Sequence, residues 1–497
     1  MQRKQLTLVI VSLLVVVLSV SLAWFTTQII GKGKNLNVTS ANLQIVFTDS
    51  DGSISGSNIE PGWSATKTFT VQNNSKSEYK YNIVIKDLLN TFVTNGYLKY
   101  KITSTNDGYN MTEFKDIPKS STPKDTILAY SVVIPNGVTQ SYTIEFKYTN
   151  DENIDQSNDM GKQLSGTLFI TEGTELTFLT QLLADKSTRL TRTDFSKVLT
   201  DNNTNTLYTS TEDSKTVYYF AGNATDNWVK FGKNASNQDL YWRIIRTNSE
   251  GSIRLLYHGT STTATNAYIG TIKFNSTYND AMYVGYMYGT SGSQVNNRTN
   301  TNSSTIKGVI DTWYKDNLNS NYGKYLSATA IYCNDRSVTS GTYSVSSSFG
   351  YSAKTRLDVN KTPTYNCADT NDKFTADTST GNGKLTYPIA LMTADEVSFA
   401  GGKYGSNAPT WYYYNSANES STGSTWWWVL SPYIWDGSYA HVFGVHGSSW
   451  PGLLNSNLVL DTGGVRPVTS LKSCVKYSSG DGTATNPYTI QETTSGC

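Results

Sequence analysis

Two motifs decide the fold of the C-terminal half of this chain: WWWVLSP at residues 426–432 and GGVRPV at residues 463–468. Alternate side chains of a β-strand point to opposite faces, so three consecutive tryptophans can supply the core on both sides of one strand. Arg466 stands beside Pro467, where we expect the guanidinium to pair with a carboxylate as the fold closes. Both motifs therefore predict a structural scaffold rather than a reactive site.

The segment between these motifs, residues 433–462, has an unusual composition. It contains no Lys, Arg, Glu, Gln or Met, and it holds two of the three histidines of the chain. Rigid aromatic rings offer a large contact area at little cost in side-chain entropy, as they do in antibody paratopes. We therefore predict a ligand-binding surface, with the candidate residues Tyr433, Trp435, Asp436, Ser438, Tyr439, His441, Phe443, His446, Trp450 and Asn455. Alternatively, residues such as Val442 and Phe443 belong to the hydrophobic core and contact no ligand. We expect about half of the aromatic candidates to be buried.

Further toward the N-terminus, predicted strands are interspersed with two predicted helices. Runs rich in aromatic and β-branched residues at 218–223, 227–232, 241–246 and 252–257 predict adjacent strands. Residues 305–318 carry an apolar stripe with helical spacing. The sequence TADE at 393–396 is a capping box, and two glycines at 401–402 end the helix that it starts. Two helices among many strands predict an α+β domain.

The order of these motifs resembles that of bacterial surface domains with a C-type-lectin-like fold. The resemblance covers residues 218–470 and extends to a closing GDGT…NPY at 480–488. This group is related in fold to formylglycine-generating enzymes and to the variable proteins of diversity-generating retroelements. The resemblance implies that residues 433–462 display the ligand-binding surface. In the variable proteins, adenine-directed mutagenesis diversifies this segment, and it would produce the residue types found here except Trp435 and Trp450. The alternative explanation for the composition is an adhesive loop that avoids long charged side chains.

The first third of the chain predicts a two-sheet sandwich. Residues 42–171 contain short runs with period-two alternation, such as Leu43, Ile45 and Phe47, separated by polar turns. The sequences SLAWF at 21–25, NIEPG at 58–62 and QNN at 72–74 resemble those of secreted matrix-fibre and camelysin-like proteins of Gram-positive bacteria. That resemblance implies a jelly-roll sandwich and residence at the cell surface or in a biofilm matrix. The resemblance does not imply that this chain forms fibres, because fibre formation depends on which strands lie at the sheet edges, and the sequence does not show this.

The N-terminal residues predict export. Arg3 and Lys4 precede an uncharged run whose core, residues 6–22, is apolar, which is the pattern of a signal peptide. Ser21 and Ala23 have the spacing of a signal-peptidase site, but the run is also long enough to span a bilayer as a retained anchor. Membrane contact is expected through residues 6–25, and then only if the signal is retained. In either case we expect the remainder to be extracellular, secreted or held at the cell surface.

The four cysteines predict disulfides rather than a metal site. Cys333, Cys367, Cys474 and Cys497 contain no CxxC pair and no Cys/His cluster, which argues against zinc. Three pairings are possible, and the sequence-local one joins Cys333 to Cys367 and Cys474 to Cys497. Each loop closed in this way would contribute on the order of 3 kcal/mol.

Two acidic loops raise the question of calcium. Asp49, Asp51, Ser53 and Glu60 loosely resemble an EF-hand loop, but Ile54 occupies the position that requires glycine. The second loop contains Asp151, Glu152, Asp155 and Asp159. We interpret both as solvated turns, so calcium is possible but not supported, and no cofactor is predicted.

Composition and motifs exclude several classes of function. The 40 Lys+Arg and 39 Asp+Glu residues leave no strongly basic domain, so a nucleic-acid partner is not expected. Motifs such as HExxH, the P-loop and GxSxG are absent, so we do not expect an enzyme. We expect an adhesin or receptor-like protein whose partner is a protein or glycan. The alternative is a structural matrix-fibre protein that assembles through its first domain.

The predicted chain is mainly β, with an α+β second domain. Residues 36–172 form a jelly-roll or immunoglobulin-like β-sandwich that follows a signal or anchor and short linker at residues 1–35. Residues 173–217 form a connector, because leucines at 176, 179, 182 and 183 have helical spacing. Residues 218–473 form the C-type-lectin-like domain, and residues 474–497 form a tail tied down by a disulfide.

Overall fold

The computed structural model describes residues 35–40, 43–49, 53–55, 59–186, 188–264, 267–411, 414–415, 426–447 and 450–497. The chain is mainly β and divides into two compact units, Met1–Leu176 and Thr177–Cys497. The predicted signal or anchor lies outside the described residues, apart from Asn35. Within the described parts of the chain, no helix combines the length and the apolar character needed to cross a bilayer.

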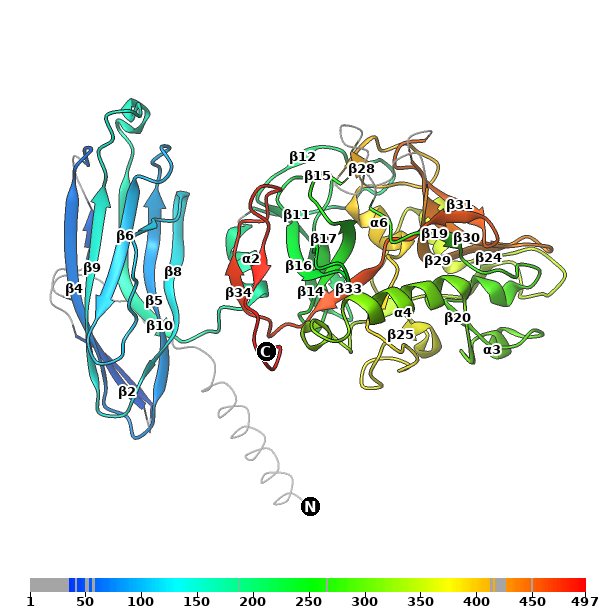
Figure 1. Ribbon diagram of the computed structural model, residues 1–497, viewed down its shortest axis with the longest axis horizontal. Coiled ribbons are helices and arrows are strands. Elements are labelled where there is room, and N and C mark those ends of the chain that lie inside the picture. The colour runs from blue at the N-terminus through cyan, green and yellow to red at the C-terminus, as the bar shows by residue number, and fades with distance from the viewer. Residues whose placement is uncertain are drawn as a thin grey trace, which may run out of the picture. The chain divides into compact units, whose positions relative to one another are not determined.

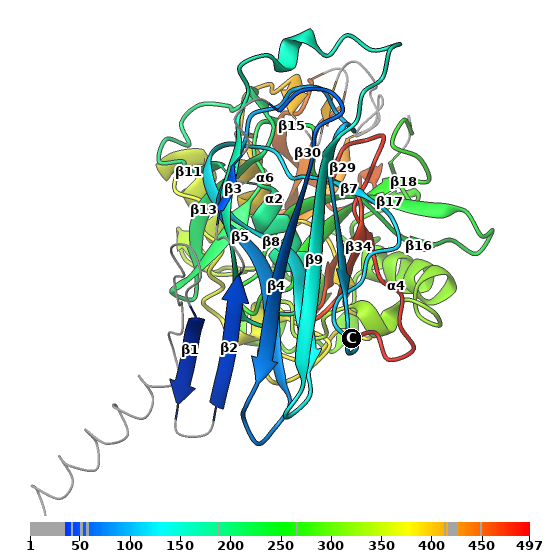
Figure 2. The same cartoon turned by 90° about the vertical axis from the view of Figure 1, so that its left-hand side faces the viewer.

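The first unit contains two β-sheets that share one core (Figures 1 and 2). One sheet has the strand order β1-β2-β4-β9-β6-β7, and the other has the order β3-β10-β5-β8. The unit also contains one short helix, η1 (Ser157–Asp159). The strands are β1 (Asn35–Ser40), β2 (Leu43–Asp49), β3 (Ser53–Ser55), β4 (Ser64–Asn73), β5 (Tyr79–Asn90), β6 (Leu98–Ser104), β7 (Lys115–Asp116), β8 (Ser120–Ile134), β9 (Thr139–Tyr148) and β10 (Leu164–Glu172).

Alternation of buried and outward side chains explains why these segments form a two-sheet core. Phe69 of β4 stacks on Tyr142 of the neighbouring strand β9 with ring centroids 4.7 Å apart. The hydroxyl of Tyr81, from β5 of the opposite sheet, donates to Gln140 at 2.6 Å and so joins the two sheets. The strands that the sequence indicated are present, and the predicted alternation of buried and outward side chains is confirmed for β4, β6 and β9. In β5 and β10 consecutive residues are buried instead, and the side chains of Leu43, Ile45 and Phe47 in β2 lie outside the description. Strand β8 was not predicted, because bulges in its pairing with β5 interrupt the alternation.

The second acidic loop is a structural feature of this unit. Asp159 is buried, and its carboxylate accepts hydrogen bonds from the backbone N–H of Val93 (2.5 Å) and Thr94 (3.2 Å) and from the hydroxyl of Tyr148 (2.7 Å). Asp151 accepts from the hydroxyl of Tyr97 at 2.9 Å. The prediction of a fully solvated loop is therefore wrong for Asp159. In the first acidic loop Asp51 lies outside the described residues, and the side chains of Asp49 and Ser53 are not described.

Replacing Asp159 with alanine is expected to destabilise the first unit by about 1–3 kcal/mol, because buried donors lose their acceptor. Burial alone would raise the pKa of Asp159, but the hydrogen bonds from Thr94, Val93 and Tyr148 outweigh it and lower the pKa. The stabilisation is therefore present above the unfolded-state pKa of about 3.9 and is lost as the pH falls through the folded value. Urea unfolding at pH 7 and pH 3 measures this effect. The difference in the free energy of unfolding between wild type and Asp159→Ala should be smaller at pH 3 than at pH 7. An equal difference at both pH values would contradict a stabilising role for the ionised Asp159.

The second unit is built on two larger sheets (Figure 1). The first has the order β11-β13-β14-β17-β18-β33-β26, with β16 paired to β17. Its strands are β11 (Thr188–Thr191), β13 (Thr206–Glu212), β14 (Lys215–Tyr219), β16 (Trp228–Lys233), β17 (Asp239–Thr247), β18 (Ile253–Gly259), β26 (Ile389–Ala390) and β33 (Val468–Leu471). The adjacent strands predicted between residues 218 and 257 are thus confirmed.

The second sheet of this unit carries the segment predicted to bind a ligand. Its order is β19-β32-β29-β24-β23, with β30 paired to both β29 and β31. Its strands are β19 (Thr271–Lys273), β23 (Val338–Ser340), β24 (Phe349–Tyr351), β29 (Trp427–Trp435), β30 (Ala440–Val445), β31 (Leu454–Leu458) and β32 (Thr462–Gly464). Smaller pairs are β12 (Asn202–Asn203) with β15 (Asn223–Ala224), β20 (Met287–Tyr288) with β21 (Asn302–Ser303), β22 (Tyr332–Cys333) with β25 (Lys373–Phe374), β27 (Thr410–Trp411) with β28 (Tyr414–Asn415), and β34 (Tyr477–Ser479) with β35 (Thr489–Ile490).

The two predicted helices form where their local signals place them. Helix α4 (Thr305–Asn317) begins after Ser304, whose hydroxyl accepts from the N–H of Lys307. Helix α6 (Ala394–Ala400) has the predicted capping box, in which Thr393 and Glu396 cap each other, and it ends at Gly401 with φ 123°. The other described helical segments of the unit are α2 (Phe178–Asp185), η2 (Ala281–Val284), α3 (Gln294–Asn297), η3 (Gly323–Tyr325), α5 (Ser352–Lys354), the π-helix η4 (Thr355–Asn360) and η5 (Thr370–Asp372).

The predicted connector and tail belong to the body of the second unit. The predicted helix is present as α2, and it packs into the core through Phe178 and Leu182. The strands β11 and β13, within residues 173–217, join the first sheet instead of forming a separate linker. Residues 474–497 return to α2, where the N–H of Phe178 donates to the carbonyl of Val475 at 2.7 Å. The division of the chain therefore falls at 176/177 rather than at 172/173 and 217/218.

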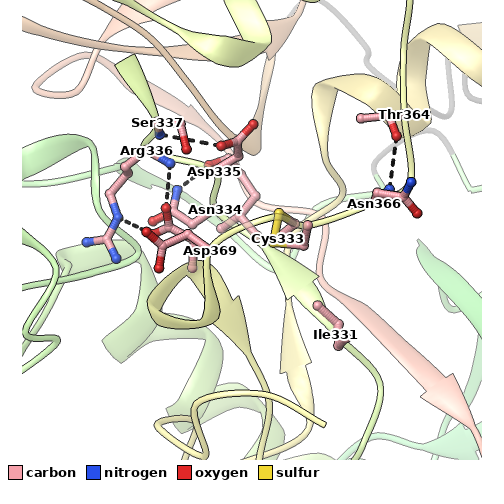
Figure 3. The surroundings of a disulfide bond; sticks show 12 residues. Ile331, Cys333, Asn334, Asp335, Arg336, Ser337, Thr364, Asn366 and Asp369 are labelled. Carbon is pink, nitrogen blue, oxygen red and sulfur yellow. Dashed lines mark hydrogen bonds and ion pairs between the residues drawn. A yellow bond between two sulfur atoms is a disulfide. The ribbon is translucent and has the colours of Figure 1, made fainter. Parts of the chain in front are cut away.

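Both disulfides have the sequence-local pairing: Cys333 bonds to Cys367 and Cys474 bonds to Cys497. Two disulfides fit an oxidising, extracellular-like environment. The first lies in a region that contains several charged residues, where Asn334, Asp335 and Arg336 follow Cys333 (Figure 3). Arg336 lies within the closed loop, is buried, and pairs at 2.6 Å with Asp372 just beyond Cys367, so the disulfide and a buried ion pair stabilise the same region.

A second buried ion network lies between the first sheet and helix α6. Arg246 of β17 contacts Glu212 at 2.8 Å and Glu396 at 2.9 Å, and Arg254 of β18 contacts the same Glu396 oxygen at 2.7 Å. All four side chains are nearly inaccessible to solvent. Since an unpaired buried charge is very costly, these four residues must stay together for the unit to fold.

Candidate ligand-binding surface

The tryptophan motif positions the candidate segment by anchoring strand β29. Trp427 and Trp428 are both fully buried, and the indole N–H of Trp428 donates to the carbonyl of Ile272 at 2.9 Å. The Arg466 guanidinium lies 4.9 Å from the Trp427 ring centroid and donates to the carbonyl of Tyr257. The motifs at both ends of the segment are thus parts of the core, and the segment between them is held at its two ends.

The hairpin β29–β30 divides the predicted residues into buried and outward groups. Trp435 and Phe443 are buried in the core, and Val442 beside them is buried as well. Tyr439, Asp436 and Ser438 are exposed at the turn. The accessible groups therefore lie at the turn and at the ends of the strands, while Trp435 and Phe443 anchor the two strands in the core.

Asp436 shapes the turn between the two strands. One carboxylate oxygen accepts from the backbone N–H of Ser438 (2.8 Å) and Tyr439 (2.7 Å), and the other lies 3.0 Å from Nε2 of His441. Burial would raise the pKa of Asp436, but the hydrogen bonds from His441 and from the two N–H groups outweigh it and lower the pKa. An ionised Asp436 therefore fixes the turn and orients the half-buried ring of His441.

A stacked pair of tyrosines stands next to this turn. The rings of Tyr439 and Tyr278 are 5.2 Å apart and nearly parallel, and both side chains are exposed. The backbone explains the contact, because the N–H of Ala440 donates to the carbonyl of Tyr278 at 3.0 Å. Tyr278 was not among the predicted residues, since it is remote in sequence and no local motif marks it.

Tyr433 belongs to a second, less accessible cluster. Its ring stacks on that of Tyr404, and the two hydroxyls lie 2.7 Å apart. Phe443 meets the Tyr433 ring edge-on at 5.0 Å, and the amine of Lys354 lies 5.4 Å from its centroid. The hydroxyl of Tyr433 also lies 3.5 Å from the carboxylate of Asp358 in the π-helix η4. Burial and the neighbouring hydroxyl and carboxylate raise the pKa of Tyr433 strongly, so it remains a neutral hydrogen-bonding group.

The third cluster contains His446 and Trp450. The His446 ring is buried; it stacks on Trp426 with centroids 6.1 Å apart and meets Trp450 edge-on at 5.6 Å. Burial lowers the pKa of His446, which keeps the ring neutral. Trp450 is 55% exposed, which is the largest exposure of any aromatic side chain that the structure describes. The side-chain oxygen of Asn455 accepts from the neighbouring N–H of Ser456, so this amide is partly used in shaping its own strand.

The distribution of exposed rings distinguishes this surface from the rest of the molecule. Among the described side chains, the large exposed aromatics are Tyr278, Tyr439 and Trp450. Two of them lie in the predicted segment, and the third stacks on a member of it. Three of the seven predicted aromatic or histidine positions are buried, namely Trp435, Phe443 and His446, which is close to the expected half.

The chemistry available at this surface is that of binding. It offers ring faces, hydroxyls and one carboxylate–imidazole pair, and these groups suit stacking and hydrogen bonding to an uncharged ligand. Within the described residues, no group of three or more His, Cys, Asp or Glu side chains is placed to hold a metal ion.

Comparisons of this chain with protein-family models, with curated proteins and with solved structures found no match. The function is therefore argued from the geometry of the surface itself.

Proposed function

We propose that this protein is exported and binds a protein or glycan through the surface formed by residues 433–462, as an adhesin or receptor-like protein of the cell surface. The observation that carries the proposal is that the large exposed aromatic side chains among the described residues belong to this segment or stack on it: Tyr439 with its partner Tyr278 at the start of β30, and Trp450 beyond the end of β30. Exposed rings on a rigid hairpin are the side chains that dominate binding energy in known interfaces. The two disulfides and the N-terminal apolar run support an extracellular location.

The second unit supplies the rigid support that such a surface needs. In this proposal it is a C-type-lectin-like domain, and the order of its sequence motifs is the support for that finer assignment. The buried Trp435 and Phe443 anchor the β29–β30 hairpin in the core, so Tyr439 at its turn loses little freedom when a ligand binds. Asp436 and Ser438 lie beside the ring of Tyr439 and are the polar groups that would orient the ligand.

A double substitution, Tyr439→Ala with Trp450→Ala, is expected to reduce binding about tenfold or more, because both rings are exposed anchors. The measurement is binding of the full chain to an array of glycans and an array of extracellular proteins. The matched control is Leu190→Ala with Val295→Ala, which removes two exposed apolar side chains of the same unit outside the surface. Equal signals for the double variant and the wild type would remove the site assignment, provided that thermal unfolding shows both to be folded.

A second function, assembly into a matrix fibre through the first unit, is favoured by one specific observation. Strand β8 is 15 residues long and stands at the edge of its sheet, paired on one side to β5. Pro123, Lys124 and Asp125 discourage edge pairing in its first half, but residues 126–134 carry no charge. Fibres grown from full-length protein and abolished by Val133→Lys would support assembly, whereas a monodisperse wild type at high concentration would contradict it.

A further inference from the structure

A lysine and an aspartate lie together in the interior of the second unit. The Nζ atom of Lys186 is 2.8 Å from Oδ2 of Asp226, and the two side chains are 1% and 3% exposed. Lys186 directly follows helix α2, and Asp226 lies in the short segment between β15 and β16, so the contact joins residues 40 positions apart. Burying two opposite charges carries a large desolvation cost, which only very complete pairing offsets.

The pairing of these two groups is incomplete in a particular way. Oδ2 of Asp226 accepts two hydrogen bonds, from Lys186 and from the backbone N–H of Asn205 at 2.7 Å. Oδ1 of the same carboxylate is buried and has no hydrogen-bond partner among the described residues. Lys186 makes one further hydrogen bond, to the carbonyl of Asp481 at 3.1 Å. A buried carboxylate oxygen without a partner is rare in folded proteins and calls for an explanation.

The walls of this site exclude water. The amine of Lys186 lies 5.2 Å from the centroid of the Tyr488 ring, which packs edge-on against Phe178. The Tyr488 hydroxyl donates to Asp185 at 2.9 Å, which places a second carboxylate next to the pair. Gly482, at φ 84°, brings the C-terminal segment against Asp226: a Cβ there would lie 2.4 Å from the Asp226 carbonyl oxygen.

We propose that Lys186 and Asp226 form an intramolecular isopeptide bond. The lone pair of Nζ forms a bond to Cγ of Asp226, and the Cγ–Oδ1 bond breaks with its electron pair staying on oxygen. Two of the three protons of the Lys186 ammonium pass to Oδ1, which leaves as one water molecule, and the third proton stays on the amide nitrogen. An ammonium and a carboxylate thus become a neutral amide and water, and no oxidant, reductant or other reactant is consumed.

The surrounding hydrogen bonds fit the product better than they fit the ion pair. Oδ2 becomes the amide oxygen and keeps the N–H of Asn205, which also stabilises the negative charge that develops on this oxygen during the attack. The amide N–H keeps the carbonyl of Asp481 as its acceptor. The oxygen that leaves is the one without a partner, so every polar atom of the product is satisfied and both buried charges are removed.

Another buried pair in the unit lacks this arrangement. Lys307 contacts Asp311 four residues further along the same helix, and the Asp311 side chain is 20% exposed, so an amide there would close a small ring on one helical turn. Lys80 and Glu175 in the first unit are both about half exposed to water. Lys186 and Asp226 are the pair in which burial, long sequence separation and a product-like hydrogen-bond pattern coincide.

The test is the mass of the full-length protein after reduction and alkylation of its cysteines. Tryptic digestion of the wild type is expected to give one peptide in which residues 163–189 are joined to residues 216–230, at a mass about 18 Da below the sum of the two, equal to one water. Finding both linear peptides, cut after Lys186 and unlinked, would overturn the proposal without any variant being needed.

Four variants locate the bond. Lys186→Met and Asp226→Ala should each abolish the linked peptide, while Lys307→Met, which removes another buried lysine of the same unit, should keep it. Asp226→Asn should form the same link with loss of ammonia, so that the product mass equals that of the wild-type link. A linked peptide that persists in Lys186→Met, or disappears in Lys307→Met alone, would contradict the assignment.

Discussion

Replacing Glu396 with glutamine is expected to destabilise the second unit by about 3–5 kcal/mol, because the two buried guanidinium groups that share this carboxylate lose their counter-charge. One oxygen of Glu396 receives Arg246 and Arg254, and the other accepts the N–H of Thr393. An amide of the same shape keeps one acceptor but presents N–H donors to Thr393. Glu396→Gln therefore weakens both the N-terminal cap of helix α6 and the ion network with Arg246 and Arg254.

The destabilisation caused by Glu396→Gln should depend on pH. Burial by itself would raise the pKa of Glu396, but Arg254 and Arg246 outweigh burial and hold the pKa below its usual value. A lowered folded-state pKa gives stability that is present above the unfolded value of about 4.3 and is lost as the pH falls through the folded value. At pH 7 the free energies of unfolding of wild type and Glu396→Gln, measured by chemical denaturation, should differ by the full amount of about 3–5 kcal/mol. In acid this difference in the free energy of unfolding should become smaller.

The matched control for this prediction is Glu175→Gln. Glu175 pairs with Lys80 at 3.3 Å, but both side chains are 48% exposed, and exposed pairs contribute about 0–1 kcal/mol. A change below 1 kcal/mol in Glu396→Gln would mean that Glu212 alone satisfies Arg246, and the network argument would then be wrong.

Removal of the Cys333–Cys367 disulfide by paired alanine substitutions is expected to cost about 4 kcal/mol, from the entropy of a loop of this length in the unfolded chain. The bond closes a sequence separation of 34 residues. Within that loop Arg356 pairs with Asp335 at 2.6 Å, and just beyond it Asp372 pairs with Arg336, so loosening the loop also exposes these charges. Thermal unfolding under oxidising conditions measures the effect.

The second disulfide provides the comparison. Cys474–Cys497 spans 23 residues, so loop entropy alone predicts a cost within about 0.5 kcal/mol of the first. Both of its cysteines are exposed, whereas Cys367 is buried, so a mild reductant should open this bond first. A loss below 1 kcal/mol from removal of Cys333–Cys367 would show that the ion pairs, and not the disulfide, hold that loop.

Local signals explain which elements could be predicted. The cap of α6 depends on Thr393 and Glu396, three residues apart, and the apolar stripe of α4 repeats within one helix, so both were predicted from sequence. Strand β8 was missed because bulges break its period and because Ser131 adopts a positive φ of 46°. The connector was misjudged because nothing in residues 173–217 reveals that β11 and β13 find their partners further along the chain.

The candidate surface was predicted as a segment but not as a set of neighbours. Composition identified residues 433–462, and Phe443, predicted as a ligand-binding residue with core as the alternative, is buried. The inward position of Trp435 and the half-buried Tyr433 depend on register shifts between β29 and β30, near Pro432 and Ile434, which no sequence pattern announces. Tyr278 and Tyr404 reach the surface from remote segments, and only the tertiary fold brings them there.

If the protein holds a ligand at residues 433–462 while it is tethered, as we propose, the position of helix α2 has a mechanical consequence. Helix α2 and β34 lie at one end of the second unit, and β29, β30 and β31 lie at the other (Figure 1). A pull on the ligand is therefore transmitted through the length of the unit to the segment that begins at Thr177, where the hydrogen bond from Phe178 to Val475 and the contact of Lys186 with Asp226 resist it. Under tension the first part to yield would be this entry segment, and the binding hairpin would keep its shape until the load had already passed through the rest of the unit.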